Sequence, residues 1–152
     1  MSKIDARLAE LSLTLPAAPA PAANYVPYVQ SGAQLFVSGQ ISADANGLVT
    51  GKLGADLDVT EGAAAAQLCA LSLIAQAKAA LGDLDRVARV VKLVGFVNST
   101  ADFTDQPKVI NGASDLMVQV FGEAGRHARS AVSAASLPMG VAVEIEAIFE
   151  IA

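Results

Sequence analysis

The final segment, residues 141–151, alternates between apolar and acidic side chains, and this alternation constrains the fold more than any other feature. Apolar residues occupy every second position, while Glu144, Glu146 and Glu150 lie between them. Successive side chains of a strand point to opposite faces of its sheet. The segment is therefore predicted to be a strand with one face in a core and the other face carrying carboxylates.

The rest of the chain supplies partners for this strand. Periodicity, capping residues and turn residues predict the other elements. They are a helix at 3–13 capped by Ser2, strands at 25–30 and 34–41, a turn at 44–47, an extended piece at 48–53, a helix at 61–81 capped by Thr60, a strand at 87–98, a helix at 106–121 capped by Asp105, a strand at 128–137 and a turn at 138–140. Two long helices can cover only one face of such a sheet. We therefore predict an α+β fold whose uncovered face carries Glu144, Glu146 and Arg129.

Residues 16–23, with the sequence PAAPAPAA, are predicted to be a connector because proline lacks an N–H donor and stiffens the chain. Residues 1–23, a helix plus this connector, are then an appendage of one domain at 24–152. A chain of 152 residues is too short for two comfortable domains. Its charged fraction of 16% is below the ~25% of an average domain, which predicts an oligomer.

The charge and the rare residues exclude several functional classes. The net charge is −5 and the ten basic residues are scattered, which argues against a nucleic-acid partner. One cysteine, Cys69, excludes an internal disulfide, and one histidine, His127, excludes a multi-histidine metal site. We expect Cys69 in the core and His127 in a solvated loop. Early charges and later prolines exclude a signal peptide and a membrane helix near the N-terminus, so a cytoplasmic location is expected.

Arg129 and Glu144 are the residues best suited to chemistry. Arg129 begins a strand of small residues with no carboxylate nearby in the sequence, and a guanidinium can hold a carboxylate through two parallel hydrogen bonds. Glu144, on the next strand along the chain, could hold and polarise a water molecule. An equally good interpretation of the pattern alone is a cross-strand ion pair between the two.

Three groups of residues resemble the RidA/YjgF family. The C-terminal group is His127 to Val132 (HARSAV), Leu137-Pro138 and Val143 to Ile148 (VEIEAI). The upstream groups are Pro27 to Gly32 (PYVQSG) and Phe36 to Ile41 (FVSGQI). The resemblance covers residues 24–151 in the family's order, and the order and spacing together make it specific.

The resemblance implies a chorismate-mutase-like fold with a mixed sheet, two helices on one face, and a homotrimer with three clefts between subunits. It implies hydrolysis of enamines and imines of the 2-aminoacrylate type to 2-keto acids and ammonia, an activity of the 2-iminobutanoate/2-iminopropanoate deaminase type, with no cofactor and no metal. By position, Arg129 matches the arginine that binds the substrate carboxylate and Glu144 the glutamate associated with water. The positions matching the cleft lining are Tyr28, Ser38, Gly39, Asn111 and Ala131.

The chain also departs from the family pattern. Ala131 stands where a cysteine is common, the appendage at 1–23 precedes the usual start, and the loop at 104–110 is longer. Two alternative functions therefore stay open: a non-catalytic trimer that binds a small carboxylate or a protein partner, and RNA cleavage. The acidic net charge and the single histidine disfavour RNA cleavage.

Overall fold

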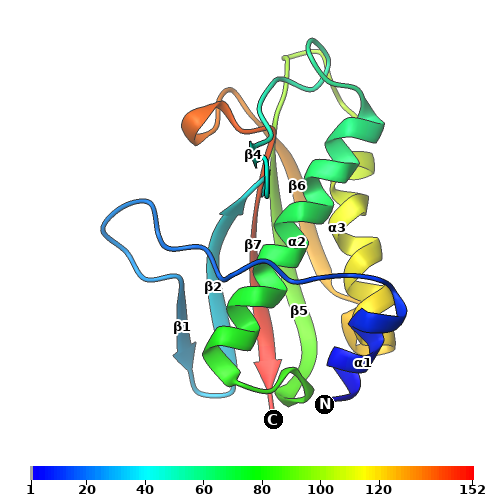
Figure 1. The fold of residues 1–152 in the computed structure, drawn as a ribbon. Coiled ribbons are helices and arrows are strands. Elements are labelled where there is room, and N and C mark those ends of the chain that lie inside the picture. The colour runs from blue at the N-terminus through cyan, green and yellow to red at the C-terminus, as the bar shows by residue number, and fades with distance from the viewer. Residues whose placement is uncertain (1) are drawn as a thin grey trace.

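A five-stranded mixed sheet organises the computed structural model, which describes residues 2–152 (Figure 1). Its strand order is β1-β2-β7-β5-β6, and only the β5–β6 pair is parallel. The strands are β1 (Tyr28–Ser31), β2 (Gln34–Ile41), β5 (Val87–Asn98), β6 (Ala128–Ala134) and β7 (Val143–Ile151). A separate small hairpin pairs β3 (Ala43–Asp44) with β4 (Gly47–Leu48).

Two long helices, α2 (Val59–Leu81) and α3 (Gln106–Phe121), lie side by side on one face of the sheet, which confirms the predicted layer arrangement (Figure 1). The prediction of Thr60 as the cap of α2 is wrong, because Asp58 caps this helix. The Asp58 carboxylate accepts the backbone N–H of Glu61 at 2.8 Å, and the Glu61 carboxylate accepts the backbone N–H of Asp58 at 3.1 Å. Asp105 does begin α3, but its side chain makes no capping bond.

The core lies between α2, α3 and the sheet. Cys69 is fully buried in it, as predicted, and burial raises the pKa of its thiol. By length and composition α2 could also cross a membrane, yet 61% of its most apolar window is buried against the rest of the protein. The apolar character of α2 on nearly all sides is explained by its contacts with both the sheet and α3.

Several predicted boundaries shift. The first strand begins at Tyr28, because Pro27 accepts the Ser38 N–H but has no N–H of its own to donate to the ladder. The helix α1 ends at Glu10 (Lys3–Glu10), β6 at Ala134, and β7 begins only at Val143. The predicted extended piece at 48–53 contributes the end of β4 and isolated bridges from Thr50 to Val141 and from Leu53 to Leu57 and Ser99.

The N-terminal segment packs along the domain in the described part of the chain. The backbone N–H groups of Lys3 and Ile4 donate to the Asp85 carboxylate at 2.9 and 3.0 Å, and Leu8 is 5% exposed. The connector then crosses α2 and loops outward before entering β1 (Figure 1). A domain boundary near residue 23 stays a prediction, and Met1 lies outside the described residues.

Candidate functional site

Arg129 lies on edge strand β6 and points toward α3. Its Nη1 donates to Asn111 Oδ1 at 2.8 Å and to Ser114 Oγ at 3.1 Å, and its Nη2 donates to the Pro107 carbonyl at 3.3 Å. Arg129 pairs with Leu93 of β5, which is fully buried on the helix-covered face. The expectation that Arg129 lies on the uncovered face is therefore wrong, because strand register directs it toward the helices.

The partners of Arg129 come from one stripe of α3. Pro107, Asn111 and Ser114 are spaced four and three residues apart, which places them on the same side of a helix. Asn111 was expected at the site and the structure brings it to Arg129. Ala131 follows on the same face of β6, opposite Gly95 of β5. Ser114 and the Pro107 carbonyl were not predicted, although the helical spacing from Asn111 could have indicated both.

His127 is half-buried and hydrogen-bonded, which corrects the prediction of a solvated loop residue. Its Nδ1 is 2.6 Å from the Gly125 carbonyl oxygen and its Nε2 is 2.9 Å from Ser114 Oγ. Burial lowers the pKa of His127, the bond to Gly125 opposes this effect, and the nearby charge of Arg129 lowers the pKa further.

Glu144 belongs to a second cluster, on the other side of the sheet. It leaves β7 on the face opposite to Val143 and Ile145, which are fully buried. Its carboxylate lies against Gly39, where β2 and β7 shift register between Val37 and Gln40. A Cβ on Gly39 would stand 2.5 Å from Glu144 Oε2, so only glycine leaves room for this carboxylate. Burial, and secondarily Glu146, raises the pKa of Glu144.

Glu144 and Gly39 line a pocket of about 630 Å³ at the edge of β2. The connector forms much of the wall of this pocket, although none of its residues was predicted to belong to the site. The other lining residues are Pro19, Ala20, Pro21, Ala22, Ala23, Tyr25, Pro27, Gln40, Ile41, Ala43, Ser72, Pro138 and Met139. The buried amide of Gln76 fixes this wall by donating to the Pro19 carbonyl at 2.7 Å. The contribution of the connector was not predicted, because its prolines and alanines carry no functional group that would indicate a binding role.

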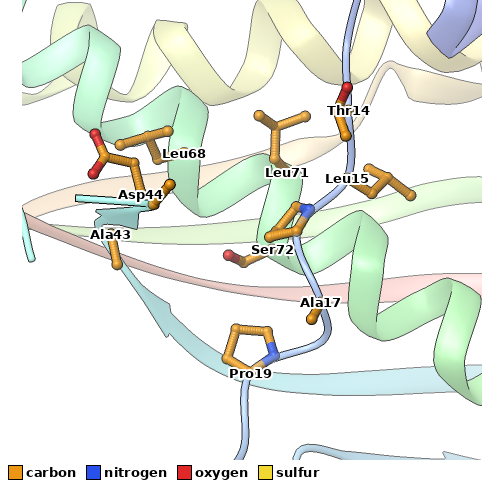
Figure 2. A pocket seen from close by; sticks show the side chains of 11 residues that line it. Thr14, Leu15, Ala17, Pro19, Ala43, Asp44, Leu68, Leu71 and Ser72 are labelled. Atoms are coloured by element: carbon orange, nitrogen blue, oxygen red, sulfur yellow. The ribbon is translucent and has the colours of Figure 1, made fainter. Parts of the chain in front are cut away.

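A neighbouring pocket of about 560 Å³ runs under the connector (Figure 2). Leu15, just before the connector, and Ala17 and Pro19 of the connector line this pocket together with Leu71 and Ser72 of α2. The two pockets share residues of the connector and of α2, so the connector forms part of both walls.

The other expected lining residues take different places. Ser38 lies beside Gly39, where its hydroxyl donates to the Val26 carbonyl at 2.8 Å. Tyr28 pairs with Val37 and packs against the core, outside the set of residues that line the pocket of Glu144. Tyr25, which lies before β1, lines that pocket instead.

Arg129 and Glu144 lie apart within one chain. Strand β5 lies between β6 and β7, and Glu144 is level with Val132, three positions along from Arg129. A separation of three residues along the strands and two strand spacings across the sheet places the two backbones roughly 14 Å apart. The alternative of a cross-strand ion pair is wrong, because the strands are not neighbours and the side chains leave opposite faces.

The described part of the chain holds no cluster of three or more His, Cys, Asp or Glu side chains with the geometry to bind a metal ion. The two clusters instead offer an oriented cation on one side and a partly buried carboxylate on the other. The carboxylate can accept a proton or hold a water molecule, and the cation can hold an anion.

Comparison with known proteins gives three informative relatives. Protein TCP17 of Trypanosoma cruzi is 60% identical over 151 residues, which cover 98% of this chain and 94% of that protein. The structure of Atu1372 from Agrobacterium tumefaciens, described as having unknown function, is 53% identical with a TM-score of 0.91, covering 98% and 92% of the two chains. The structure of E. coli TdcF with bound serine is 28% identical with a TM-score of 0.64, covering 90% and 94%.

A mixed sheet with both long helices on one face defines an α+β protein of the chorismate-mutase-like fold, as expected. Residues 5–150 match the family described as "YjgF/chorismate mutase-like, putative endoribonuclease", and the chain belongs to this family. The RidA/YjgF resemblance of the sequence motifs is thereby confirmed at the level of the family. The match also includes most of the segment that precedes β1.

Proposed function

We propose that the protein is a cytoplasmic hydrolase of reactive enamines and imines of the 2-aminoacrylate type, which it converts to 2-keto acids and ammonia. The observation that carries this proposal is the environment of Arg129. All three of its hydrogen-bond partners are neutral, and no carboxylate among residues 2–152 lies within salt-bridge distance of it. An oriented cation whose charge is not neutralised is well suited to an anionic ligand.

The reaction needs few groups. The enamine takes a proton on carbon and becomes an iminium; water then adds to the iminium carbon, a C–O bond forms, the C–N bond breaks, and ammonia leaves. The 2-keto acid keeps the carboxylate. Arg129 would hold that carboxylate throughout, and Glu144 would hold the water and take its proton. The raised pKa of Glu144 brings its proton affinity closer to that of the groups it exchanges protons with.

The proposal requires contact between copies of the chain, because the two clusters do not meet in one chain, and we propose a homotrimer as this assembly. Arg129 of one copy would face Glu144 of another in a cleft between subunits. The uncovered face of the sheet supports an assembly, since it exposes Val29, Phe36 and Val132 at 51%, 41% and 45%. Apolar side chains gathered on one face favour burial against a partner.

Two alternatives follow from the comparisons. TdcF was solved with bound serine, a small molecule with a carboxylate, and a trimer that binds such ligands without turnover would use the same Arg129 cluster. The description of the family names an endoribonuclease, but the net charge of −5 and the neutral partners of Arg129 give no basic groove for RNA.

The first test compares ammonia release from enzymatically generated 2-aminoacrylate. Wild type should accelerate release, Arg129→Ala should abolish the acceleration, and Glu144→Gln should lower kcat more than it changes KM. Arg126→Ala and Glu123→Gln serve as matched controls, because these two side chains pair with each other at the exposed surface. Full activity of Arg129→Ala would refute the mechanism. A wild type that binds 2-oxobutanoate without releasing ammonia would favour the binding protein, and RNA cleavage lost in Arg129→Ala would favour the nuclease.

A second test addresses the divided site. Arg129→Ala and Glu144→Gln chains, unfolded together and refolded as mixed trimers, should regain activity because some clefts receive both native residues. Random mixing in a cyclic trimer restores roughly a quarter of the sites. Mixed trimers without activity, or sedimentation of a stable monomer, would contradict the shared site.

A further inference from the structure

The hydrogen bonds that link His127 to Arg129 through the Ser114 hydroxyl have a defined direction. A carbonyl oxygen only accepts, so the 2.6 Å contact with Gly125 places a proton on His127 Nδ1. Burial and the charge of Arg129 favour the neutral imidazole, which has a single N–H. His127 Nε2 must then accept, and the Ser114 hydroxyl donates to it at 2.9 Å. The lone pairs of Ser114 Oγ are then free to accept the hydrogen bond that Arg129 Nη1 donates at 3.1 Å.

The same bonds determine which part of the guanidinium is free. An arginine has five N–H donors. Both donors on Nη1 are used, by Asn111 and Ser114, and one donor on Nη2 is used by the Pro107 carbonyl. The Nε–H and one N–H of Nη2 remain. Nε and Nη2 lie along one edge of the guanidinium plane, and two parallel donors on one edge match the two oxygens of a carboxylate.

We infer that Ser114 and His127 are positioning residues that fix Arg129 with its Nε/Nη2 edge as the only docking edge for the substrate carboxylate. The inference rests on the proposed function for the identity of the ligand, but its geometry concerns Arg129 alone. Without this chain of bonds, a partly exposed arginine would sample several rotamers, and the entropy cost of ordering it would weaken binding.

Helix stability does not explain the serine. Alanine is the better helix former inside α3, and serine there competes for backbone hydrogen bonds. Ser114 instead joins two residues of the 127–129 segment to α3 through its side chain. Removing the hydroxyl should therefore leave the fold intact and change the site.

The experiment uses the full chain with Ser114→Ala, the conservative Ser114→Thr, and Gln119→Ala as a control that removes an exposed uncharged side chain from α3. Binding of 2-oxobutanoate is measured by calorimetry, and KM and kcat by ammonia release. Ser114→Ala should raise Kd and KM about 5- to 20-fold with kcat changed less than about threefold. Ser114→Thr should restore most of the affinity, and Gln119→Ala should match wild type.

A double-mutant cycle separates positioning from a general structural effect. In an Arg129→Ala background, Ser114→Ala should weaken binding no further, because the residue it positions is absent. An additive loss, or unchanged Kd and KM in Ser114→Ala, would overturn the inference while leaving the hydrolase intact.

Nitrogen-15 NMR tests the geometry without any ligand. Wild type at neutral pH should show His127 protonated on Nδ1 and unprotonated on Nε2. The Arg129 Nε should be ordered in wild type and mobile in Ser114→Ala. A proton on Nε2, or an Arg129 Nε equally ordered in both proteins, would refute the positioning role. If wild type binds 2-oxobutanoate in a Ser114-dependent way but releases no ammonia, the hydrolase proposal fails and the positioning role stands.

Discussion

Replacing Gly39 with alanine should impair turnover without unfolding the protein, because the three atoms nearest to the added methyl group all belong to the flexible side chain of Glu144. The new Cβ would stand 2.5 Å from Glu144 Oε2 and 2.9 Å from its Cδ. Ordinary contacts begin at 3.4 Å, so the oxygen must retreat by about 0.9 Å. Misplacing a reacting group by this much costs about 10- to 100-fold in rate. We therefore expect kcat to fall by that factor.

Stability should change little in the same variant. Gly39 has backbone angles open to other residues, and Gly→Ala at such a site stabilises by about 0.4–1 kcal/mol through the unfolded chain. That gain offsets the cost of turning the flexible end of Glu144. The assay pairs ammonia release with urea unfolding and sedimentation. A kcat within twofold of wild type, with the oligomer intact, would refute the placement of Glu144 in the reaction.

Three further predictions concern stability and reactivity. Gly112→Ala should lower the free energy of unfolding by about 1–3 kcal/mol, because the new Cβ would overlap the Ala63 carbonyl and push α3 away from α2. Urea unfolding measures this change, and an unchanged midpoint would contradict the close contact between the helices. Cys69, fully buried and with a raised pKa, should react with a thiol reagent only as fast as the protein unfolds, and rapid labelling of the native protein would show the core to be open. Burial raises the pKa of Glu144 in the folded state, so the folded state holds more protons and stability falls as pH rises through that raised pKa. Glu144→Gln should remove this loss, giving an advantage in the free energy of unfolding that grows from about pH 4 upward and then levels off; a difference independent of pH would contradict it.

The sequence was informative wherever local periodicity decides the structure. The alternation at 141–151 predicted a strand with a buried face, and the pattern of 61–81 predicted a helix; both predictions are confirmed. Cys69 among leucines was correctly placed in the core. The ordered motifs were enough to identify the family. Whether Arg129 and Glu144 act on a substrate stays a prediction.

Tertiary structure decided what those patterns do not contain. Strands β6 and β7 follow each other along the chain, and no local signal indicates that β5 lies between them in the sheet. The position of β5 separates Arg129 from Glu144, and the strand register places the two side chains on opposite faces. Likewise, no local signal indicates that the connector would line the pocket of Glu144. The periodicity of a segment indicates which side chains share a face of that segment, because backbone geometry fixes the direction of each side chain relative to the residues next to it in the sequence. Which strand lies beside which, and what packs over them, depends on contacts between distant residues, so only the folded chain determines which groups can meet.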